Sequence, residues 1–398
     1  MEKLSGLSHL FVTVFLSTFA NFTVIPAITD VTMLAVCPGQ DECSLAIYLT
    51  ANVIMQIIGM GAMIITPVIG NLSDQYGRKA LLTLPITLAI IPLVILAYSM
   101  ETNFFYAYFV IRTLTAMVCD GSTNCLALAY VADKIPDGER APAFGILAGV
   151  GSAAFVCGTL ATRFLSTAST FKVAAFMSML AAVYVRVFLE ESIPNEVGIR
   201  QPILKEAPNA TKEDADLEKT TQYFLKARFH FNKNQYADLM LIVAVAGTIS
   251  QLIFMPILVP VIGEEKLLSI GLLMGFTNMF VSSIAWSNWV PYATTVFSIF
   301  TVCVQPSLRS IVSKQVGPIE QGKAQGCISG ISSFATIISP LIFSPLTALF
   351  LSEEAPFHFP GFSIMCIGFA MMIAFIQSIM IRGVPSSHKA ERNHSIEA

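Results

Sequence analysis

The sequence contains little charge. Only 12% of its 398 residues are Asp, Glu, Lys or Arg, whereas a soluble globular domain has about 25%. Lys and Arg number 23 against 26 Asp and Glu, so the chain lacks the basic excess with which proteins bind nucleic acid. Hydrophobic residues make up 55% of the chain, and its mean hydropathy is +0.69. These values exclude a soluble or disordered chain and favour a protein that resides in the lipid bilayer.

Motifs of enzyme chemistry are also lacking. The sequence has no Walker phosphate-binding loop, no catalytic Ser/His/Asp arrangement and no His/Cys cluster with metal-ligand spacing. We therefore expect no enzymatic activity, no cofactor and no bound metal. Six of the eight cysteines lie in apolar segments, where they are typical small packing residues. Cys37 and Cys43 flank a polar loop predicted outside the cytosol, and they could form a disulfide if that space is oxidising.

Apolar runs long enough to cross a membrane are abundant. A transmembrane helix needs about 20 mostly apolar residues. The first run has the length of a span and no convincing cleavage site, so we interpret it as a span and not as a secretory signal. The sequence predicts an all-α integral membrane protein with eleven apparent transmembrane helices. They lie near 7–29, 45–69, 80–99, 104–131, 143–165, 171–189, 238–262, 267–286, 289–312, 326–351 and 359–381.

One polar segment divides the chain. Residues 191–237 contain fourteen charged side chains and no apolar run of 20 residues. We therefore predict a six-helix half over 1–190 and a polar, cytoplasmic central loop over 191–237. A second half with five apparent helices follows over 238–381, and a cytoplasmic tail over 382–398 ends the chain.

The two halves resemble each other weakly. Val68–Gly70 is repeated as Val261–Gly263, 193 residues later. A Gly-x-x-x-Gly pattern that ends at Gly149 recurs with its end at Gly330, 181 residues later. Repeats of this length indicate that each half is one multi-helix unit, as in many secondary transporters.

A ten-residue motif follows the second predicted span. The residues from Gly70 to Lys79 read GNLSDQYGRK and match the signature G-x-x-x-D-[RQ]-x-G-R-[RK] of the major facilitator superfamily. The stretches 129–133 and 139–141 resemble the loop after span four in tetracycline-efflux-like members. The whole chain is similar to the tetracycline-transporter-like and hippocampus-abundant-transcript-like branch, particularly its plant members. The resemblance implies a two-half helical bundle, twelve spans and membrane transport.

The resemblance also implies a cytoplasmic gate at this motif. Asp74 would face the N-terminus of a helix that starts near Gly326, where the helix dipole favours an anion. Arg78 would pair with Asp133 of the span-four loop. Glycine permits tight turns and close backbone approach, and basic residues next to a span favour the cytoplasmic side. The gate residues are Gly70, Asp74, Gly77, Arg78, Lys79 and Asp133; the alternative is a merely solvated basic turn. The second half offers only Gly263–Lys266, which predicts a degenerate counterpart.

Polar residues inside the predicted spans are candidates for a substrate or proton pathway, because such groups are costly in a bilayer. Arg112, Asp120 and Asn124 fall on one side of span four. Arg112 and Asp120 are about 12 Å apart along a continuous helix, so we expect no direct pairing. A structural ion pair is the alternative for both. Further candidates are Asn52 and Gln56, which share a face of span two, and Asn21 in span one, although such amides also join helices.

The charges create a conflict over topology. The positive-inside rule places residue 190 in the cytosol and residue 238 on the other side, so 191–237 must cross the membrane without an apolar run. The family plan implies that span seven is missing, and we expect a splice variant or a shortened gene. Three consequences are open: residues 223–236 are pulled partly through, the second half inserts inverted, or the protein does not transport.

The expected function is a carrier that moves a small organic solute by alternating access, with proton coupling as an option. The first alternative is a non-transporting regulatory or interaction subunit, or an inactive splice variant. The second is a solute sensor with a carrier fold. The sequence does not distinguish the plasma membrane from a vacuolar or other internal membrane, and it leaves the oligomeric state open.

Overall fold

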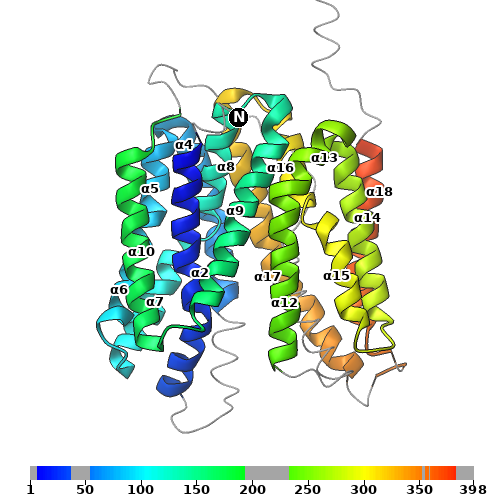
Figure 1. The fold of residues 1–398 in the computed structure, drawn as a ribbon, viewed down its shortest axis with the longest axis horizontal. Coiled ribbons are helices and arrows are strands. Elements are labelled where there is room, and N and C mark those ends of the chain that lie inside the picture. Colours follow the sequence, from blue (N-terminus) through cyan, green and yellow to red (C-terminus); the bar gives the residue numbers. More distant parts are fainter. Residues whose placement is uncertain (1–6, 37–53, 193–232, 352–354, 358, 382–398) are drawn as a thin grey trace, which may run out of the picture.

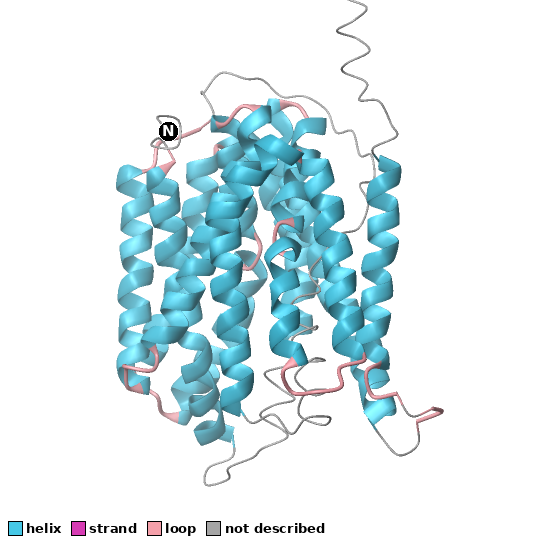
Figure 2. Ribbon diagram, turned by 45° about the vertical axis from the view of Figure 1, so that its right-hand side comes forward, coloured by secondary structure: helices cyan, strands magenta, loops and turns pink. Residues whose placement is uncertain are grey.

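The protein folds into two bundles of long helices that stand side by side (Figure 1). The computed structural model describes residues 7–36, 54–192, 233–351, 355–357 and 359–381. Helices are the regular secondary structure throughout these ranges, and Figure 2 shows them joined by short loops. The predicted all-α fold is confirmed. Cys37, Cys43 and Asn52 lie outside the described residues, as does most of the predicted central loop.

The first bundle follows the predicted spans closely. Its helices are α2 (Ser8–Val36), α4 (Ile54–Tyr76), α5 (Arg78–Leu88), α6 (Ile90–Tyr98), α7 (Thr102–Cys119), α8 (Ser122–Lys134), α9 (Arg140–Ala161) and α10 (Thr167–Phe188). Helices α5 and α6 together form one span. Helix α2 packs on α9 through the edge-to-face rings of Phe22 and Phe155, whose centroids are 4.8 Å apart.

The second bundle begins with α12 (Lys233–Ile249), which continues through a π-helical turn into α13 (Met255–Ile262). It goes on with α14 (Glu264–Ser283), α15 (Val290–Thr301), α16 (Val304–Gln315), α17 (Gln321–Leu351) and α18 (Phe362–Ile381). The described helices provide ten spans that are long and apolar enough to cross a membrane. Large apolar side chains such as Ile64, Val187 and Met380 are exposed on their outer surface, as lipid contact requires.

The predicted fourth span is divided into two helices. The stretch 104–131 forms α7 and α8, which are separated at Asp120 and Gly121. Asp120 is extended, and Gly121 has φ +88°, a conformation that glycine adopts without the clash of a Cβ atom. Together with the ten spans above, this two-part segment gives the eleven predicted spans, and the predicted span 289–312 is likewise divided, into α15 and α16. Figure 2 shows such short non-helical segments midway between the two ends of the bundle.

The same order of elements occurs in both bundles. Helix α7, α8, a 3₁₀ turn at Asp137–Glu139 and α9 correspond to α15, α16, a 3₁₀ turn at Pro318–Glu320 and α17. The 3₁₀ turns begin 181 residues apart, which is the spacing of the Gly-x-x-x-Gly echo. The other echo is out of register. Gly263 corresponds to Gly77 and not to Gly70, because both end a helix with nearly the same conformation (φ +87° and +95°, ψ 149°).

The turns after Gly77 and Gly263 lie at one end of the bundle, which we call the motif face. Glu264 contacts α16 near its end, and the carbonyl of Ser313 in the same turn accepts a hydrogen bond from Arg140 of α9. Ser192 is also at this face, since its hydroxyl contacts Asp133. Residues 238–262 form one continuous span, so Asp238 lies at the opposite face. The described residues on either side of 193–232 therefore lie at opposite faces, and the second half is not inverted relative to the first.

Candidate functional site at the junction of the two halves

Asp74 connects the two halves at the motif face. It lies in the last turn of α4, and its two carboxylate oxygens accept hydrogen bonds from the N–H groups of Gly322 (2.9 Å) and Lys323 (2.8 Å). These N–H groups belong to the first turn of α17, where backbone donors have no partner within the helix. A carboxylate there is favoured by the helix dipole as well. The helix begins at Gln321, five residues before the expected start near Gly326.

Arg78 holds the motif turn together from within. Its side chain is 0% exposed and lies 2.5 Å from Asp74, 2.9 Å from Asp133 and 2.5 Å from the hydroxyl of Ser73. Asp74 and Asp133 are almost as deeply buried, at 8% and 7%. A buried cation is stable only when such partners compensate its lost hydration. The second negative charge is balanced by the positive end of α17.

Glycines allow α4 and α17 to touch. A Cβ atom on Gly70 would lie 2.3 Å from the carbonyl oxygen of Gly322, and one on Gly322 would lie 2.1 Å from the Arg78 guanidinium. Further along α17, Gly326 and Gly330 lie against Pro67. The three glycines of α17 recur every four residues and so share one face. This seam brings the two halves into backbone contact, as small residues do in membrane helices.

Two residues that sequence reasoning missed complete the junction. The Glu191 carboxylate accepts hydrogen bonds from the backbone N–H groups of Arg78 (2.7 Å) and Lys79 (3.1 Å), and so caps the start of α5. The Ser192 hydroxyl donates to Asp133 at 2.9 Å. Both residues lie within four residues of the end of α10, and Glu191 falls in the segment predicted as the central loop. The signal in the sequence was an acidic residue at the end of a span, on the same side of the membrane as the basic motif.

The second half has a junction of opposite charge. Glu264 follows Gly263 as Arg78 follows Gly77, and it forms an ion pair with Lys314 and accepts a hydrogen bond from Ser310 (2.6 Å). Lys314 stands 181 residues after Asp133, at the matching end of α16. The positions of cation and anion are therefore exchanged between the halves. The ion pair within each half is thus kept with inverted signs, and the degenerate gate motif at Gly263–Lys266 stays a prediction.

Arg140 joins the halves at this second junction. It is buried and donates to the carbonyl oxygens of Ser313 (3.0 Å), Ala132 (2.9 Å) and Ile135 (3.2 Å), and it forms an ion pair with Asp137 at 2.7 Å. Ser313 lies in the last turn of α16, where unpaired carbonyls favour a cation. The motif face is thus held by an anion on one helix N-terminus and a cation on one helix C-terminus.

The predicted pathway residues do not form one cluster in the structure. Arg112 and Asp120 lie 3.8 Å apart, contrary to our expectation, because Asp120 leaves the helix and the long Arg112 side chain extends along α7. Asn124 is exposed on α8, while Gln56 and Asn21 are half-buried on α4 and α2. None of these three amides forms a hydrogen bond with Arg112 or Asp120. Within the described ranges, no three metal-ligating side chains come together.

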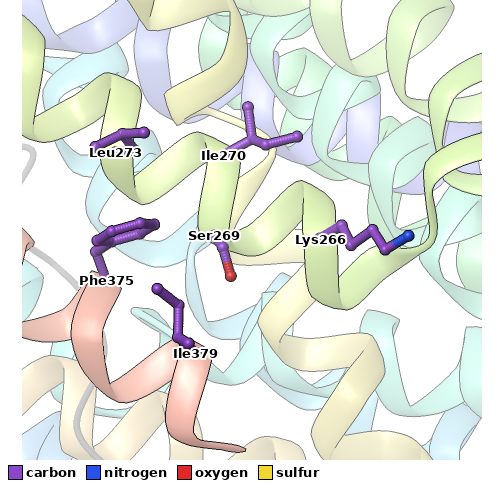
Figure 3. A pocket seen from close by; sticks show the side chains of 6 residues that line it. All are labelled: Lys266, Ser269, Ile270, Leu273, Phe375 and Ile379. Atoms are coloured by element: carbon purple, nitrogen blue, oxygen red, sulfur yellow. The ribbon is translucent and has the colours of Figure 1, made fainter. Parts of the chain in front are cut away.

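A shallow recess in the second half lies apart from the junction. It is formed by α14 and α18 and is mainly apolar, with the Lys266 ammonium at one end (Figure 3). Ser269 points into it, and its hydroxyl lies 2.8 Å from that of Ser378. The recess contains none of the predicted gate or pathway residues.

Two helical halves with a repeated order of elements, which meet through polar contacts, are the architecture of many secondary transporters. The profile of the Major Facilitator Superfamily matches residues 10–265, and the chain belongs to this family of transporters. It is 21% identical over 318 residues to the Tetracycline resistance protein, class E, of Escherichia coli, covering 74% of this chain and 77% of the relative. It is 22% identical over 344 residues to the Hippocampus abundant transcript 1 protein of Mus musculus, covering 77% and 67%.

Solved structures show the same fold. The human organic anion transporter MFSD10 (TETRAN) has a TM-score of 0.76 at 15% sequence identity, with 93% of this chain and 99% of that chain covered. The proton:xylose symporter XylE has a TM-score of 0.67, also at 15% identity, with 95% of each chain covered. The protein is therefore an integral, multi-pass membrane protein with a transporter fold.

Proposed function

We propose that the protein is a carrier that moves a small organic solute across a lipid bilayer by alternating access, and that its motif face is cytoplasmic. The observation that carries the proposal is the contact of Asp74 with the first turn of α17, which closes the two halves against each other at this face. The basic residues of the motif turn support the cytoplasmic assignment. Family membership supports transport as the activity.

Rocking of the halves would break a small and defined set of contacts. Opening at the motif face separates α4 from α17 and releases the two hydrogen bonds of Asp74. Hydrogen bonds to charged groups contribute about 1.5–3 kcal/mol each, so the closed state is favoured by a few kcal/mol at this point. The contacts of Arg78 with Asp133 and of Glu191 with α5 stay within the first half. They keep the turn rigid while the junction opens, so each half moves as one body.

Flux through the purified protein tests the proposal. The protein is reconstituted in liposomes and offered a mixture of small organic solutes, whose entry is followed by mass spectrometry with and without a pH gradient. We expect at least one solute to cross faster than in empty liposomes, and an effect of the gradient would show proton coupling. Binding of a solute without flux would instead support a sensor. The absence of both would support a regulatory subunit or an inactive variant.

A further inference from the structure

The break between α7 and α8 lies deep in the bundle. Gly121 precedes Asp133 of the motif face by twelve residues, which corresponds to about 18 Å along a helix. A membrane core is about 30 Å thick, so the break lies near its middle. A helix start at this depth is costly unless something satisfies its free N–H groups, because no bulk water is present.

The start of α8 is rich in donors that have no partner. The residue before this helix is Gly121, which has no side chain that could accept hydrogen bonds from the N–H groups of the first turn. The hydroxyl groups of Ser122 and Thr66 are fully buried, and neither forms a hydrogen bond in the described structure. Thr66 belongs to α4 and faces the break, since its hydroxyl oxygen is the nearest atom to a Cβ built on Gly121, at 3.4 Å. Backbone N–H groups of α8 and buried hydroxyls from two helices therefore lie at the same break.

The charged groups at the break are weakly engaged with each other. The guanidinium of Arg112 lies 3.8 Å from the Asp120 carboxylate, which is longer than a direct charge-assisted hydrogen bond. The side chain of Arg112 is 32% exposed and that of Asp120 is 44% exposed. The guanidinium of Arg112 also interacts with the Tyr108 hydroxyl, and its remaining N–H donors are left for a further acceptor. A planar guanidinium matches a carboxylate in particular.

We propose that this break is a subsite for the carboxylate group of the transported solute. The inference rests on the proposed carrier function. The free N–H groups of α8, the two hydroxyls and Arg112 supply donors. A carboxylate competes with Asp120 for Arg112, and a ligand with a single negative charge keeps its repulsion by Asp120 small. A solute bound there lies about midway between the two faces of the membrane. Carriers that work by alternating access hold their substrates at this depth.

Binding of simple carboxylates to the whole protein in lipid nanodiscs tests the inference. The probes are acetate and benzoate, with acetamide and benzamide as neutral counterparts, and affinity is measured by calorimetry. We expect at least one carboxylate to bind saturably and its amide to bind about tenfold more weakly or not at all. Loss of one hydrogen bond corresponds to a roughly three- to tenfold weaker affinity, which is the change expected for Thr66→Val and for Ser122→Ala.

A matched control separates the subsite from general damage. Thr115→Val removes a hydroxyl from α7 that is already bonded to the Ile111 carbonyl, at 2.9 Å, and should leave the affinity unchanged. The inference is overturned if neither carboxylate binds, or if Thr66→Val and Ser122→Ala bind as the unmodified protein does. Solute flux without carboxylate binding would overturn the subsite and leave the carrier function standing. Carboxylate binding without flux of any solute would support an anion site at the break and would overturn the carrier function.

Discussion

At the residue scale, the junction depends on a few groups that chemistry makes hard to replace. Asp74 acts on a helix start in the other half, and Arg78 is buried among two carboxylates and a hydroxyl. The motif predicted these residue types, and the structure adds their distances. Glu191 was not predicted, because its contact with Arg78 joins positions 113 residues apart and the charge of Glu191 alone does not identify its partner.

Asp74→Asn removes the charge from the junction and keeps the shape of the side chain. One amide oxygen can still accept a hydrogen bond, so we expect the closed state to weaken by about 1–2 kcal/mol and solute flux to fall several-fold. The amount of protein in the membrane should stay the same. The control is Glu101→Gln, an exposed position before α7. Unchanged flux in Asp74→Asn would count against a gating role.

Gly322→Ala places a methyl group where the halves touch. Its Cβ would lie 2.1 Å from the Arg78 guanidinium and 2.4 Å from the carbonyl oxygen of Gly70. The motif face therefore cannot close fully, and we expect a loss of flux of about tenfold or more with normal insertion. Gly317→Ala is the control, because a Cβ there meets nothing within 4 Å. Equal flux in both variants would show that close packing of α4 on α17 is dispensable.

At the element scale, the two halves share one plan with inverted charges. Helices α8 and α16 each follow a break, end at the motif face and carry the partner of a residue that follows a positive-φ glycine. The repeat was only faintly visible in the sequence. The Gly-x-x-x-Gly match aligned equivalent positions, whereas the Val-Ile-Gly match did not. The turn geometry is the same at Gly77 and Gly263, but the residues around these two glycines differ.

A charge exchange tests the second junction. Glu264→Lys and Lys314→Glu each put two like charges side by side, so each should lower flux by several-fold through repulsion of α14 and α16. The double variant restores an opposite pair in the arrangement that the first half uses, and we expect it to recover most of the flux. Flux in reconstituted liposomes is the measurement. A double variant as impaired as the worse single variant would refute the pairing as a functional contact.

At the scale of the whole molecule, the orientation of the second half is the decisive feature. Ser192 and the turn at Gly263 lie at the motif face, whereas Asp238 lies at the opposite face. This arrangement lets α4 meet α17 and α9 meet α13. An inverted second half would place the start of α17 far from Asp74 and would remove both junctions.

Reporter tags of known sidedness test this orientation in a living cell. We expect a tag inserted at Gly263–Lys266 and a tag on the C-terminal tail both to be cytoplasmic, because the motif turn carries the positive charges that face the cytosol. Accessibility to a membrane-impermeant label, before and after permeabilisation, is the measurement. If both tags face away from the cytosol, the second half is inverted, and the regulatory or inactive-variant function gains support.

Residence in a membrane, the helical class, the positions of nearly all spans and the ten-residue motif at 70–79 could be predicted from the sequence. These properties follow from local composition, because a bilayer admits only long apolar helices and a motif is a local pattern. The break at Gly121, the proximity of Arg112 to Asp120, the cap by Glu191 and the inverted pair of Glu264 and Lys314 became visible in the folded protein alone. Each depends on side chains or backbone turns brought together by packing, which no single stretch of sequence encodes.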